Sequence, residues 1–232
     1  MHAIITGGLG FIGSRIAIRL VNEGHKVTVL DSEATAVTRG VPGADVIHID
    51  MRDDLAVQAL RLPDAQCLMH LAGPSSGMAS AKDPVGTIAA GYRITHNALQ
   101  LALRLGVRRV VHASSMNVYG NVPRDRNPIR EDHPCVPISH YGIGKFANER
   151  LVEVFCASHS ISFSNLRMFN VYGPGQNLAR TDQGLVSIFT TMLMKSPKIL
   201  SRGSLERFRD LVHVDDAVTA WTLSAMRTDA TG

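Results

Sequence analysis

The sequence predicts an α/β fold with a doubly wound parallel sheet, and three observations support this. Short runs rich in β-branched residues alternate along the chain with longer amphipathic segments. The short runs are apolar at successive positions, which is typical of parallel strands covered on both faces. Each pair of runs is separated by a segment long enough for a right-handed crossover helix.

Six strands are expected in the first part of the chain, at residues 2–6, 26–30, 45–49, 66–71, 109–113 and 162–167. Each of them is apolar on both faces. We therefore expect all six strands to be buried between two layers of helices.

Helical periodicity fills the intervals, at residues 11–23, 53–60, 85–105 and 141–158. In the first of these segments, Ile12, Ile16 and Leu20 recur on one face and form an apolar stripe. Gly24 and Gly106 stand where two of the helices should end, because glycine readily adopts the left-handed conformation of a helix C-terminus.

The pattern is less regular after residue 167. Gly173-Pro174-Gly175 predicts a turn, and residues 177–183 read as a loop. A helix over 184–195, short strands near Ile199 and over 211–214, and a helix over 215–226 are then expected. No flexible linker separates this part from the rest, so a second lobe would grow out of the first fold.

Composition narrows the protein class. The 232 residues are 45 % hydrophobic and 19 % charged, enough to bury a core without disulfide or metal staples. No run approaches the ~18 apolar residues of a membrane span, and the N-terminus lacks a secretion signal, so no membrane partner is expected.

Cys67, Cys135 and Cys156 form no C-x-x-C pair, which indicates reduced thiols in a cytoplasmic protein and no metal site. Basic residues are scattered despite a net charge of +4, so no nucleic-acid partner is expected.

The strongest local signal is Thr6-Gly7-Gly8-Leu9-Gly10-Phe11-Ile12-Gly13, which follows a strand and opens a helix. Side chains in this turn would keep a pyrophosphate away from the backbone N–H groups and from the positive helix end. Gly13 would let the helix pack on the strand. Taken alone, the motif is also compatible with an ordinary strand–helix turn.

Acidic residues follow the second and third strands. Asp31 can accept both hydroxyls of an adenosine ribose and would repel a 2′-phosphate, which favours NAD over NADP. An Asp that starts a turn is the alternative. Asp50 could bind an adenine amino group or cap the helix that begins near Asp53, and chemistry alone does not separate the two.

A second constellation lies further along the chain. Tyr141 and Lys145 are four residues apart on a helix and hence share a face. The ammonium would lower the pKa of the phenol, and the phenolate could abstract a hydroxyl proton as hydride leaves the same carbon. Ser114 and Ser115 follow a strand, at the sheet edge where open α/β folds hold ligands, and a serine hydroxyl could share the substrate oxygen with Tyr141. Taken alone, Tyr141 and Lys145 could also be a surface pair in which the lysine stacks on the tyrosine. The serines, taken alone, could also cap a helix or a turn.

Together, these motifs resemble those of the extended short-chain dehydrogenase/reductases, in particular the NAD-dependent epimerase/dehydratase family that acts on nucleotide sugars. The resemblance covers nearly the whole chain. Besides the motifs above, it includes His70-Leu71-Ala72-Gly73, Ser114-Ser115-Met116-Asn117-Val118-Tyr119-Gly120, Arg167-Met168-Phe169-Asn170-Val171-Tyr172-Gly173-Pro174 and residues 209–216.

The resemblance implies a division of the chain and a set of roles. Residues 1–168 would form a Rossmann-type NAD-binding domain that carries the catalytic residues, and residues 169–232 a partial substrate lobe interleaved with the end of that fold. The catalytic set would be Ser115, Tyr141 and Lys145. The NAD site would comprise Gly7, Gly10, Phe11, Ile12, Gly13, Asp31, Asp50, Met51, Leu71, Ala72, Gly73 and Ser114, together with Tyr141 and Lys145.

Four further residues are implied to contact the substrate: Ser75, Asn117, Asn170 and Arg209. Arg209 would lie near a phosphate, which suits its guanidinium geometry. A surface salt bridge of Arg209 with Asp210 or Glu206 is the alternative.

The two residues before Val118 separate the reactions of the family. Dehydratases resembling this chain carry an Asp-Glu pair there, and related decarboxylases carry a Glu at the second position. Here the pair is Met116-Asn117, and neither side chain transfers a proton at neutral pH. The resemblance therefore favours epimerisation of a nucleotide-diphosphate sugar through a transient 4-keto intermediate, with Tyr141 as the base.

Two other functions stay open, namely an NAD-dependent sugar dehydrogenase or reductase with net hydride transfer, and a non-catalytic NAD-binding member. The family also implies a homodimer through the helices over 85–105 and 141–158.

Two positions depart from the pattern of the family. Gly91 stands where members commonly carry Asn, and Pro74-Ser75-Ser76 replaces larger residues beside the sugar. Members are also longer, so the chain is expected to be either a fragment or a compact form with an open sugar site.

Overall fold

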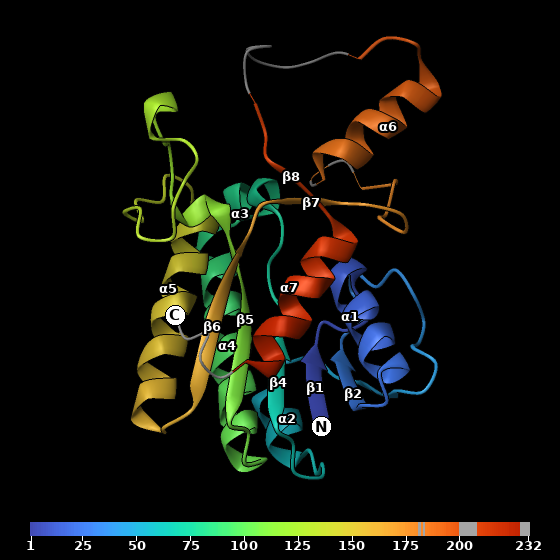
Figure 1. The fold of residues 1–232 in the computed structure, drawn as a ribbon, viewed down its shortest axis with the longest axis vertical. Helices are drawn as coiled ribbons and strands as arrows, with labels where there is room; N and C mark the ends of the chain where they lie inside the picture. Colours follow the sequence, from blue (N-terminus) through green and yellow to red (C-terminus); the bar gives the residue numbers. More distant parts are fainter. Residues whose placement is uncertain (181, 183, 200–207, 228–232) are drawn as a thin grey trace.

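The computed structural model describes residues 1–180, 182, 184–199 and 208–227. Its centre is a six-stranded sheet in the order β3-β2-β1-β4-β5-β6 (Figure 1). The strands are β1 (His2–Thr6), β2 (Lys26–Asp31), β3 (Asp45–His48), β4 (Cys67–His70), β5 (Arg109–Ser115) and β6 (Ser162–Met168). Every neighbouring pair is parallel, which confirms the predicted doubly wound sheet.

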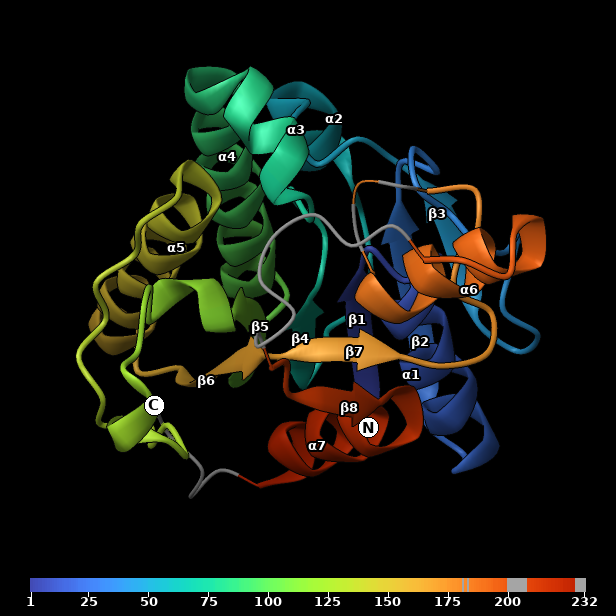
Figure 2. The same cartoon turned by 90° about the horizontal axis from the view of Figure 1, so that it is seen from above.

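Helices cover both faces of this sheet. Helices α1 (Phe11–Asn22) and α7 (Val214–Met226) pack on one face, where Ile16, Leu20 and Trp221 are buried in a common core. Helices α2 (Asp54–Ala59), α4 (Pro84–Arg104) and α5 (His140–Ser158) cover the other face, over a core that includes Leu68 and Val152. Seen from above in Figure 2, the sheet lies between these two layers.

The two edge strands differ from the expectation that all six strands would be buried. All five residues of β1 are buried, whereas both ends of β3 are exposed and only one residue of β6 is fully buried. The physical reason is position, because β3 and β6 form the two edges of the sheet and have a neighbouring strand on one side only.

A smaller layer lies across the carboxyl ends of the central strands (Figure 2). It contains α3 (Gly77–Lys82), β7 (Asn170–Tyr172), α6 (Leu185–Lys195) and β8 (Leu211–His213). Strands β7 and β8 pair in parallel, with Asn170 opposite Leu211. This layer forms a roof over one end of the sheet, and it places β7, α6 and β8 above the strand ends.

Short elements account for most remaining differences from the sequence prediction. Helix α3 and strand β7 were not predicted. Ser76 is the N-cap of α3, and its side chain accepts a hydrogen bond from the N–H of Ala79 at 3.2 Å. Two 3-10 turns occupy Met116–Val118 and Arg124–Arg126. The strand expected near Ile199 is not seen over residues 196–199, and its continuation lies outside the described residues.

The predicted helix ends are confirmed where glycines mark them. Helix α1 ends at Asn22, and Gly24 follows with a φ of 80°. Helix α4 ends at Arg104, and Gly106 follows with a φ of 64°. Both glycines adopt the left-handed conformation that a residue with a Cβ avoids. Over the described part of the chain, no helix combines the length and apolar character needed to cross a membrane.

Candidate active site

A cavity of about 670 Å³ opens at the carboxyl ends of β1, β2, β4 and β5, beneath the layer of β7 and α6. This is the edge at which open α/β sheets bind ligands. Every residue that the sequence analysis assigned to the cofactor or to catalysis lines it, and so do Ser75, Asn117 and Asn170. Arg209 does not.

The glycine turn at the cavity floor has no room for side chains. Gly7 has a φ of 71°, and a Cβ on it would lie 2.7 Å from the backbone N of Ala72. A Cβ on Gly8 would meet Cγ1 of Val29 at the same distance. Gly13 packs against the backbone of Gly7 and Gly8, so the first turn of α1 lies directly on β1. The glycines are therefore required by the packing of the turn itself.

The N-terminus of α1 is left free to bind an anion. Its N-cap is Gly10, and no side chain caps the helix. The first N–H groups of a helix have no partner within the helix, and the helix dipole makes this end positive. The open turn, the uncapped helix end and a single cavity lined by both Asp31 and Tyr141 fit a dinucleotide whose pyrophosphate would lie on Gly10 and Phe11.

Asp31 lies at the end of β2 and is almost fully buried. Its Oδ2 accepts a hydrogen bond from the N–H of Leu9 at 2.9 Å, and its Oδ1 accepts one from the N–H of Glu33 at 2.7 Å. Each carboxylate oxygen can accept a second hydrogen bond. Asp31 thus fixes the glycine turn and still has acceptor capacity for the two hydroxyls of a ribose.

Asp50 does not cap α2, which was one of its two expected roles. Its carboxylate pairs with Arg52, whose Nε lies 2.9 Å from Oδ2, and this hydrogen-bonded contact lowers the pKa of Asp50. The helix cap is supplied instead by Asp53, whose Oδ1 accepts from the N–H of Ala56 at 3.0 Å. Asp50 lines the cavity beside Met51, so only its ligand-binding alternative is retained.

Tyr141 and Lys145 lie in the first turns of α5, which Ser139 caps by accepting from the N–H of Gly142 at 3.1 Å. The Lys145 Nζ donates to the carbonyl of Ala113 at 2.8 Å and lies 5.9 Å from the centre of the Tyr141 ring. The N-cap of α5 and the carbonyl of Ala113 at the end of β5 therefore fix Lys145 beside Tyr141.

Burial controls the protonation of this pair. It lowers the pKa of Lys145 to about 8, against the opposing charge of Glu149. It also raises the pKa of Tyr141, while a hydrogen bond with Ser115 opposes that rise. The expected lowering of the phenol pKa by the ammonium is therefore not seen, because desolvation, which disfavours any charged form, is the largest influence on Tyr141.

The two serines at the end of β5 have different partners. Ser114 donates to the buried carboxylate of Glu149, so its hydroxyl has a structural partner as well as a place in the cavity wall. Ser115 accepts from Nδ2 of Asn117 at 3.0 Å and is hydrogen-bonded to Tyr141. Of the two, Ser115 is the one placed to share a substrate oxygen with Tyr141.

The substrate end of the cavity is built by β7 and the segment before β8. Asn170 Nδ2 donates to the carbonyl of Asp210 at 2.9 Å and lies 3.8 Å from Sδ of Met116. Arg209 is exposed, and its Nη1 donates to the carbonyl of Phe208 at 2.9 Å. The structure therefore brings Asn170 into the site but holds Arg209 outside it; Glu206 lies outside the described residues.

A charged pair in the cavity wall, Arg180 with Asp182, was not predicted from the sequence. Arg180 donates to Asp182 through Nε at 3.0 Å and through Nη2 at 2.8 Å, which lowers the pKa of Asp182 to about 2. Ser76 Oγ donates to the carbonyl of Asp182 at 3.3 Å. These residues lie in a loop and at a helix start without a recognisable motif, so only the fold brings them together.

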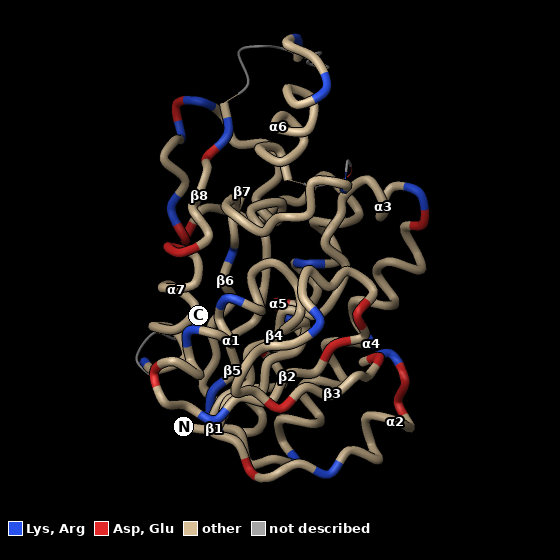
Figure 3. The backbone as a smooth tube through the Cα atoms, turned by 90° about the vertical axis from the view of Figure 1, so that its right-hand side faces the viewer, with Lys and Arg blue, Asp and Glu red and all other residues tan. Residues whose placement is uncertain are grey.

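Lys and Arg alternate with Asp and Glu along the described part of the chain. Figure 3 shows basic and acidic positions interspersed along the described backbone. Across the described ranges, no group of three or more His, Cys, Asp or Glu side chains is arranged to hold a metal ion.

Comparison with known proteins agrees with this geometry. The model of the NAD dependent epimerase/dehydratase family matches residues 3–231. A UDP-glucose 4-epimerase from Mycolicibacterium smegmatis is 33 % identical over 230 residues, which cover 95 % of this chain and 72 % of the relative. Decarboxylases and dehydratases of nucleotide sugars are also among the similar proteins.

Two solved structures share the fold closely. The UDP-glucose 4-epimerase of Thermotoga maritima with UDP-glucose superposes with a TM-score of 0.88 at 30 % identity, covering 97 % of this chain and 73 % of the other. The UDP-glucose 4-epimerase of Thermus thermophilus in complex with NAD gives a TM-score of 0.87 at 31 % identity, covering 98 % and 75 %. The match of the family model over residues 3–231, together with the parallel sheet and the glycine turn of this chain, shows that the chain belongs to the NAD-dependent epimerase/dehydratase family and uses NAD as its cofactor.

Proposed function

We propose that the protein interconverts a nucleotide-diphosphate sugar with its 4-epimer through a transient 4-keto intermediate. One observation carries the choice among the reactions of the family. The residues that follow Ser115 in the cavity wall are Met116 and Asn117, and neither exchanges protons at neutral pH. Water loss and decarboxylation need an acid or base at this place, whereas epimerisation needs only the proton carried by Tyr141.

The remaining carboxylates of the site support the same choice. Within the described residues, the acidic side chains that line the cavity are Asp31, Asp50 and Asp182. Asp31 holds the glycine turn, Asp50 pairs with Arg52, and Asp182 pairs with Arg180. Each is engaged with a donor, so none of them is an uncommitted base beside Tyr141.

The residues of the chain divide the work as follows. Tyr141 takes the proton of the sugar 4-hydroxyl and returns it at the end of the reaction. Ser115 holds the same oxygen, and Lys145 stabilises the phenolate and orients the nicotinamide ribose. NAD, held by the glycine turn and Asp31, would supply the hydride acceptor and donor for the sugar carbon. Asn117 and Ser75 border the sugar, and Asn170 the nucleotide.

We further propose that the two parts of the chain have different functions. Residues 1–168 bind NAD and carry the catalytic set, and residues 169–232 contribute part of the substrate lobe. The placement of β7, α6 and β8 over the cavity supports this division, although α7 returns to the sheet. We also propose a cytoplasmic location, since Cys67, Cys135 and Cys156 are all free, as in a reducing compartment.

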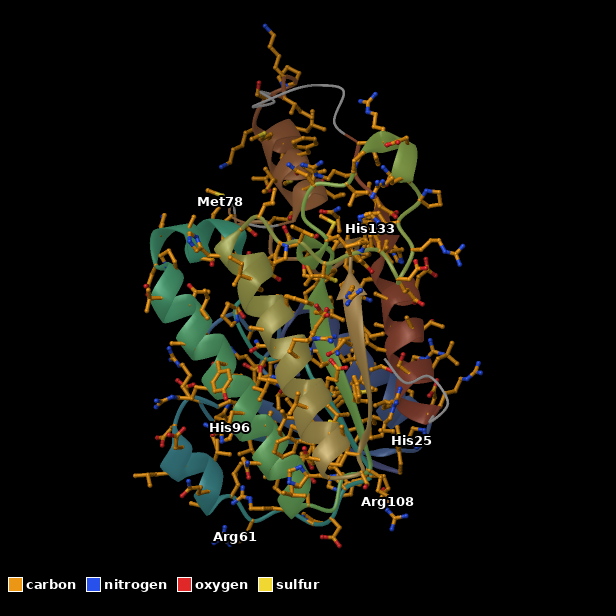
Figure 4. All side chains as sticks on the ribbon, turned by 90° about the vertical axis from the view of Figure 1, so that its left-hand side faces the viewer. His25, Arg61, Met78, His96, Arg108 and His133 are labelled. Atoms are coloured by element: carbon orange, nitrogen blue, oxygen red, sulfur yellow. The ribbon has the colours of Figure 1, made fainter. Side chains whose placement is uncertain are left out.

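A homodimer through α4 and α5 completes the proposal. The two helices lie side by side on one face of the molecule (Figure 4). Val85 and Tyr92 of α4 and Val154 of α5 are exposed by 80 %, 51 % and 65 %. Apolar side chains left in water on adjacent helices favour burial against a second copy. Sedimentation at micromolar concentration tests this, and a monomer would contradict it.

The function is tested by supplying UDP-, GDP-, dTDP- and CDP-sugars with NAD and separating the product isomers. We expect one sugar to be converted to its 4-epimer without accumulation of NADH. Stoichiometric NADH would identify a sugar dehydrogenase instead, and NAD binding without any turnover of these sugars would identify a non-catalytic member.

A further inference from the structure

The hydroxyl of Ser115 has its hydrogen bonds fixed by one neighbouring residue. The Nδ2 group of Asn117 donates to Ser115 Oγ at 3.0 Å, and the backbone N–H of Asn117 donates to the same oxygen at 3.3 Å. A serine hydroxyl has two acceptor lone pairs and one O–H donor. Asn117 therefore occupies both acceptor positions of Ser115, and the serine proton is left to bond elsewhere.

A short 3-10 turn holds the two residues in this arrangement. Ser115 is the N-cap of the turn Met116–Val118, and its backbone is extended, with a φ of −152° and a ψ of 150°. The turn packs on α5, where a Cβ on Gly142 would lie 2.5 Å from the carbonyl oxygen of Asn117. Because Gly142 directly follows Tyr141, the same packing brings Ser115 and Asn117 to the first turn of α5, beside the phenol.

The partner for the serine proton is the phenol of Tyr141. Ser115 is only 6 % exposed, it lines the large cavity together with Asn117 and Tyr141, and it is hydrogen-bonded to Tyr141. A phenolic oxygen can donate or accept. Since Ser115 has no acceptor position left, this hydrogen bond must run from the serine O–H to the phenol oxygen.

The hydrogen bonds of the site thus have one direction. Asn117 donates to Ser115, and Ser115 donates to Tyr141. The proton of the phenol cannot turn back to the serine, so it is directed toward the cavity, where the sugar hydroxyl is proposed to lie. When that hydroxyl gives up its proton, its O–H bond breaks and the phenol O–H bond forms, while the serine keeps its own proton.

We propose that Asn117 is a positioning residue that restricts Ser115 to the role of donor and thereby stabilises the Tyr141 phenolate. A hydrogen bond donated to the charged form of a group favours that form. With an apolar residue at position 117, Ser115 would regain an acceptor position and could accept from the neutral phenol instead, which favours the neutral form. This role of Asn117 rests on the proposed function of Tyr141.

The charged groups around the phenol are independent of Asn117. Burial lowers the pKa of Lys145 to about 8, and Glu149 on the same helix opposes this shift. Burial lowers the pKa of His112 on β5 to about 3, and that of His70 on β4 well below its usual value, so both are neutral at pH 7 and above. Replacing the uncharged Asn117 by Leu changes a hydrogen bond without changing the charge of the site.

The test follows the ionisation of Tyr141 in the protein bound to NAD. Ultraviolet difference absorbance reports tyrosinate, and subtraction of a Tyr141→Phe titration isolates Tyr141 from Tyr92, Tyr119 and Tyr172. In Asn117→Leu, which has similar bulk but no amide, we expect the midpoint to rise by about one pH unit, a tenfold loss of phenolate at a fixed pH. The affinity for NAD, measured by calorimetry, should not change.

A double-mutant comparison asks whether Asn117 acts through Ser115. Ser115→Ala removes the hydrogen bond to the phenolate and should also raise the midpoint. Adding Asn117→Leu to Ser115→Ala should cause no further rise, because no hydroxyl is left to orient. Met116→Leu is the matched control, since it changes the neighbouring cavity residue without removing a donor to Ser115, and it should keep the wild-type midpoint. If Asn117→Leu fails to fold, Asn117→Ala removes the same amide and replaces it.

Two results would overturn the proposal. One is an unchanged midpoint in Asn117→Leu, and the other is a rise of equal size whether or not Ser115 is present. The titration needs no sugar. If no nucleotide sugar is epimerised but the midpoint rises through Ser115, the hydrogen-bonding role of Asn117 stands and the proposed function falls.

Discussion

Arg167 and Glu149 form a doubly hydrogen-bonded ion pair between β6 and α5. The Nη2–Oε2 distance is 2.8 Å, and the Nε–Oε1 distance is 3.0 Å. Glu149 is fully buried, and it also accepts from Ser114 at the end of β5. A single carboxylate thus ties the helix that carries Tyr141 to the two strands beside it.

Removing this carboxylate should destabilise the protein strongly. Glu149→Leu leaves the partly buried guanidinium of Arg167 and the hydroxyl of Ser114 without their partner, and we expect a loss of about 3–5 kcal/mol in the free energy of unfolding. The partly exposed Glu153 on the same helix pairs with Arg150 and is the matched control. Glu153→Leu should cost less than about 1 kcal/mol. Urea unfolding measures both, and equal losses would contradict the structural role of Glu149.

The glycine turn is tested by two alanine substitutions. Gly7 and Gly24 have φ values of 71° and 80°, so Ala is strained at both. A Cβ on Gly7 would also meet the backbone of Ala72, whereas at Gly24 nothing lies within 4 Å. We expect Gly7→Ala to abolish NAD binding, measured by calorimetry, and Gly24→Ala to lower stability by only about 1 kcal/mol. NAD binding by Gly7→Ala would exclude the turn from the cofactor site.

Asp31 should set both NAD affinity and the choice between NAD and NADP. Asp31→Asn keeps the shape but removes the charge, and it places an N–H₂ group opposite the N–H of Leu9 or Glu33. Charge-assisted hydrogen bonds contribute about 1.5–3 kcal/mol, so NAD binding should weaken at least about tenfold. Affinity for NADP should fall less, because the repulsion of its 2′-phosphate is also lost. Glu33→Gln is the control, and an unchanged ratio of the two dissociation constants would remove Asp31 from the ribose.

Tyr141→Phe should reduce kcat by two or more orders of magnitude. The phenol oxygen is the proton carrier, whereas the ring and Lys145 stay in place, so the dissociation constant for NAD should be nearly unchanged. Tyr92 on α4 is half-exposed and remote from the cavity, and Tyr92→Phe should behave as the wild type. Steady-state turnover of the substrate found in the screen measures the effect. Full activity in Tyr141→Phe would end the proposed mechanism.

The buried lysine gives a pH dependence of stability in the NAD-free protein. Its pKa falls from 10.5 in the unfolded chain to about 8 in the folded one. Below pH 8 both states are protonated and the folded state carries the full cost of burying the charge. As the pH rises toward 10.5, the folded protein has released a proton that the unfolded chain still holds, and this cost is relieved.

Stability of the wild type relative to Lys145→Met should therefore rise by about 1.4 kcal/mol per pH unit across this window. Urea unfolding at a series of pH values measures the difference between the two proteins. A difference that stays constant from pH 8 to 10 would show that Lys145 has an ordinary pKa.

Local signals were sufficient for the core of this protein. The six strands, the ends of α1 and α4 and the order of the cavity residues follow from alternating apolar runs and from glycines with a structural reason. The exposure of β3 could not be derived, because Val46 and Ile47 look like any buried strand until the order of the sheet is known. Similarly, nothing in the sequence around Arg180 indicates that it pairs with Asp182 in the cavity wall.

Protonation was the least predictable property. The spacing of Tyr141 and Lys145 predicts their proximity but not their desolvation, which depends on β5, α4 and the roof above them. The direction of both pKa shifts therefore became evident only with the fold.

Helix α7 follows β8 in sequence, yet it packs on α1 and buries Trp221 in the core beneath the cofactor turn. Arg19 of α1 donates to Thr219 of α7 at 2.9 Å. Residues 169–232, which we propose contribute to the substrate lobe, are therefore not separable from the NAD-binding domain. A chimaera that exchanged everything after residue 168 with a relative would also replace one wall of the NAD domain, so recombination of specificities should succeed only when the graft stops before α7.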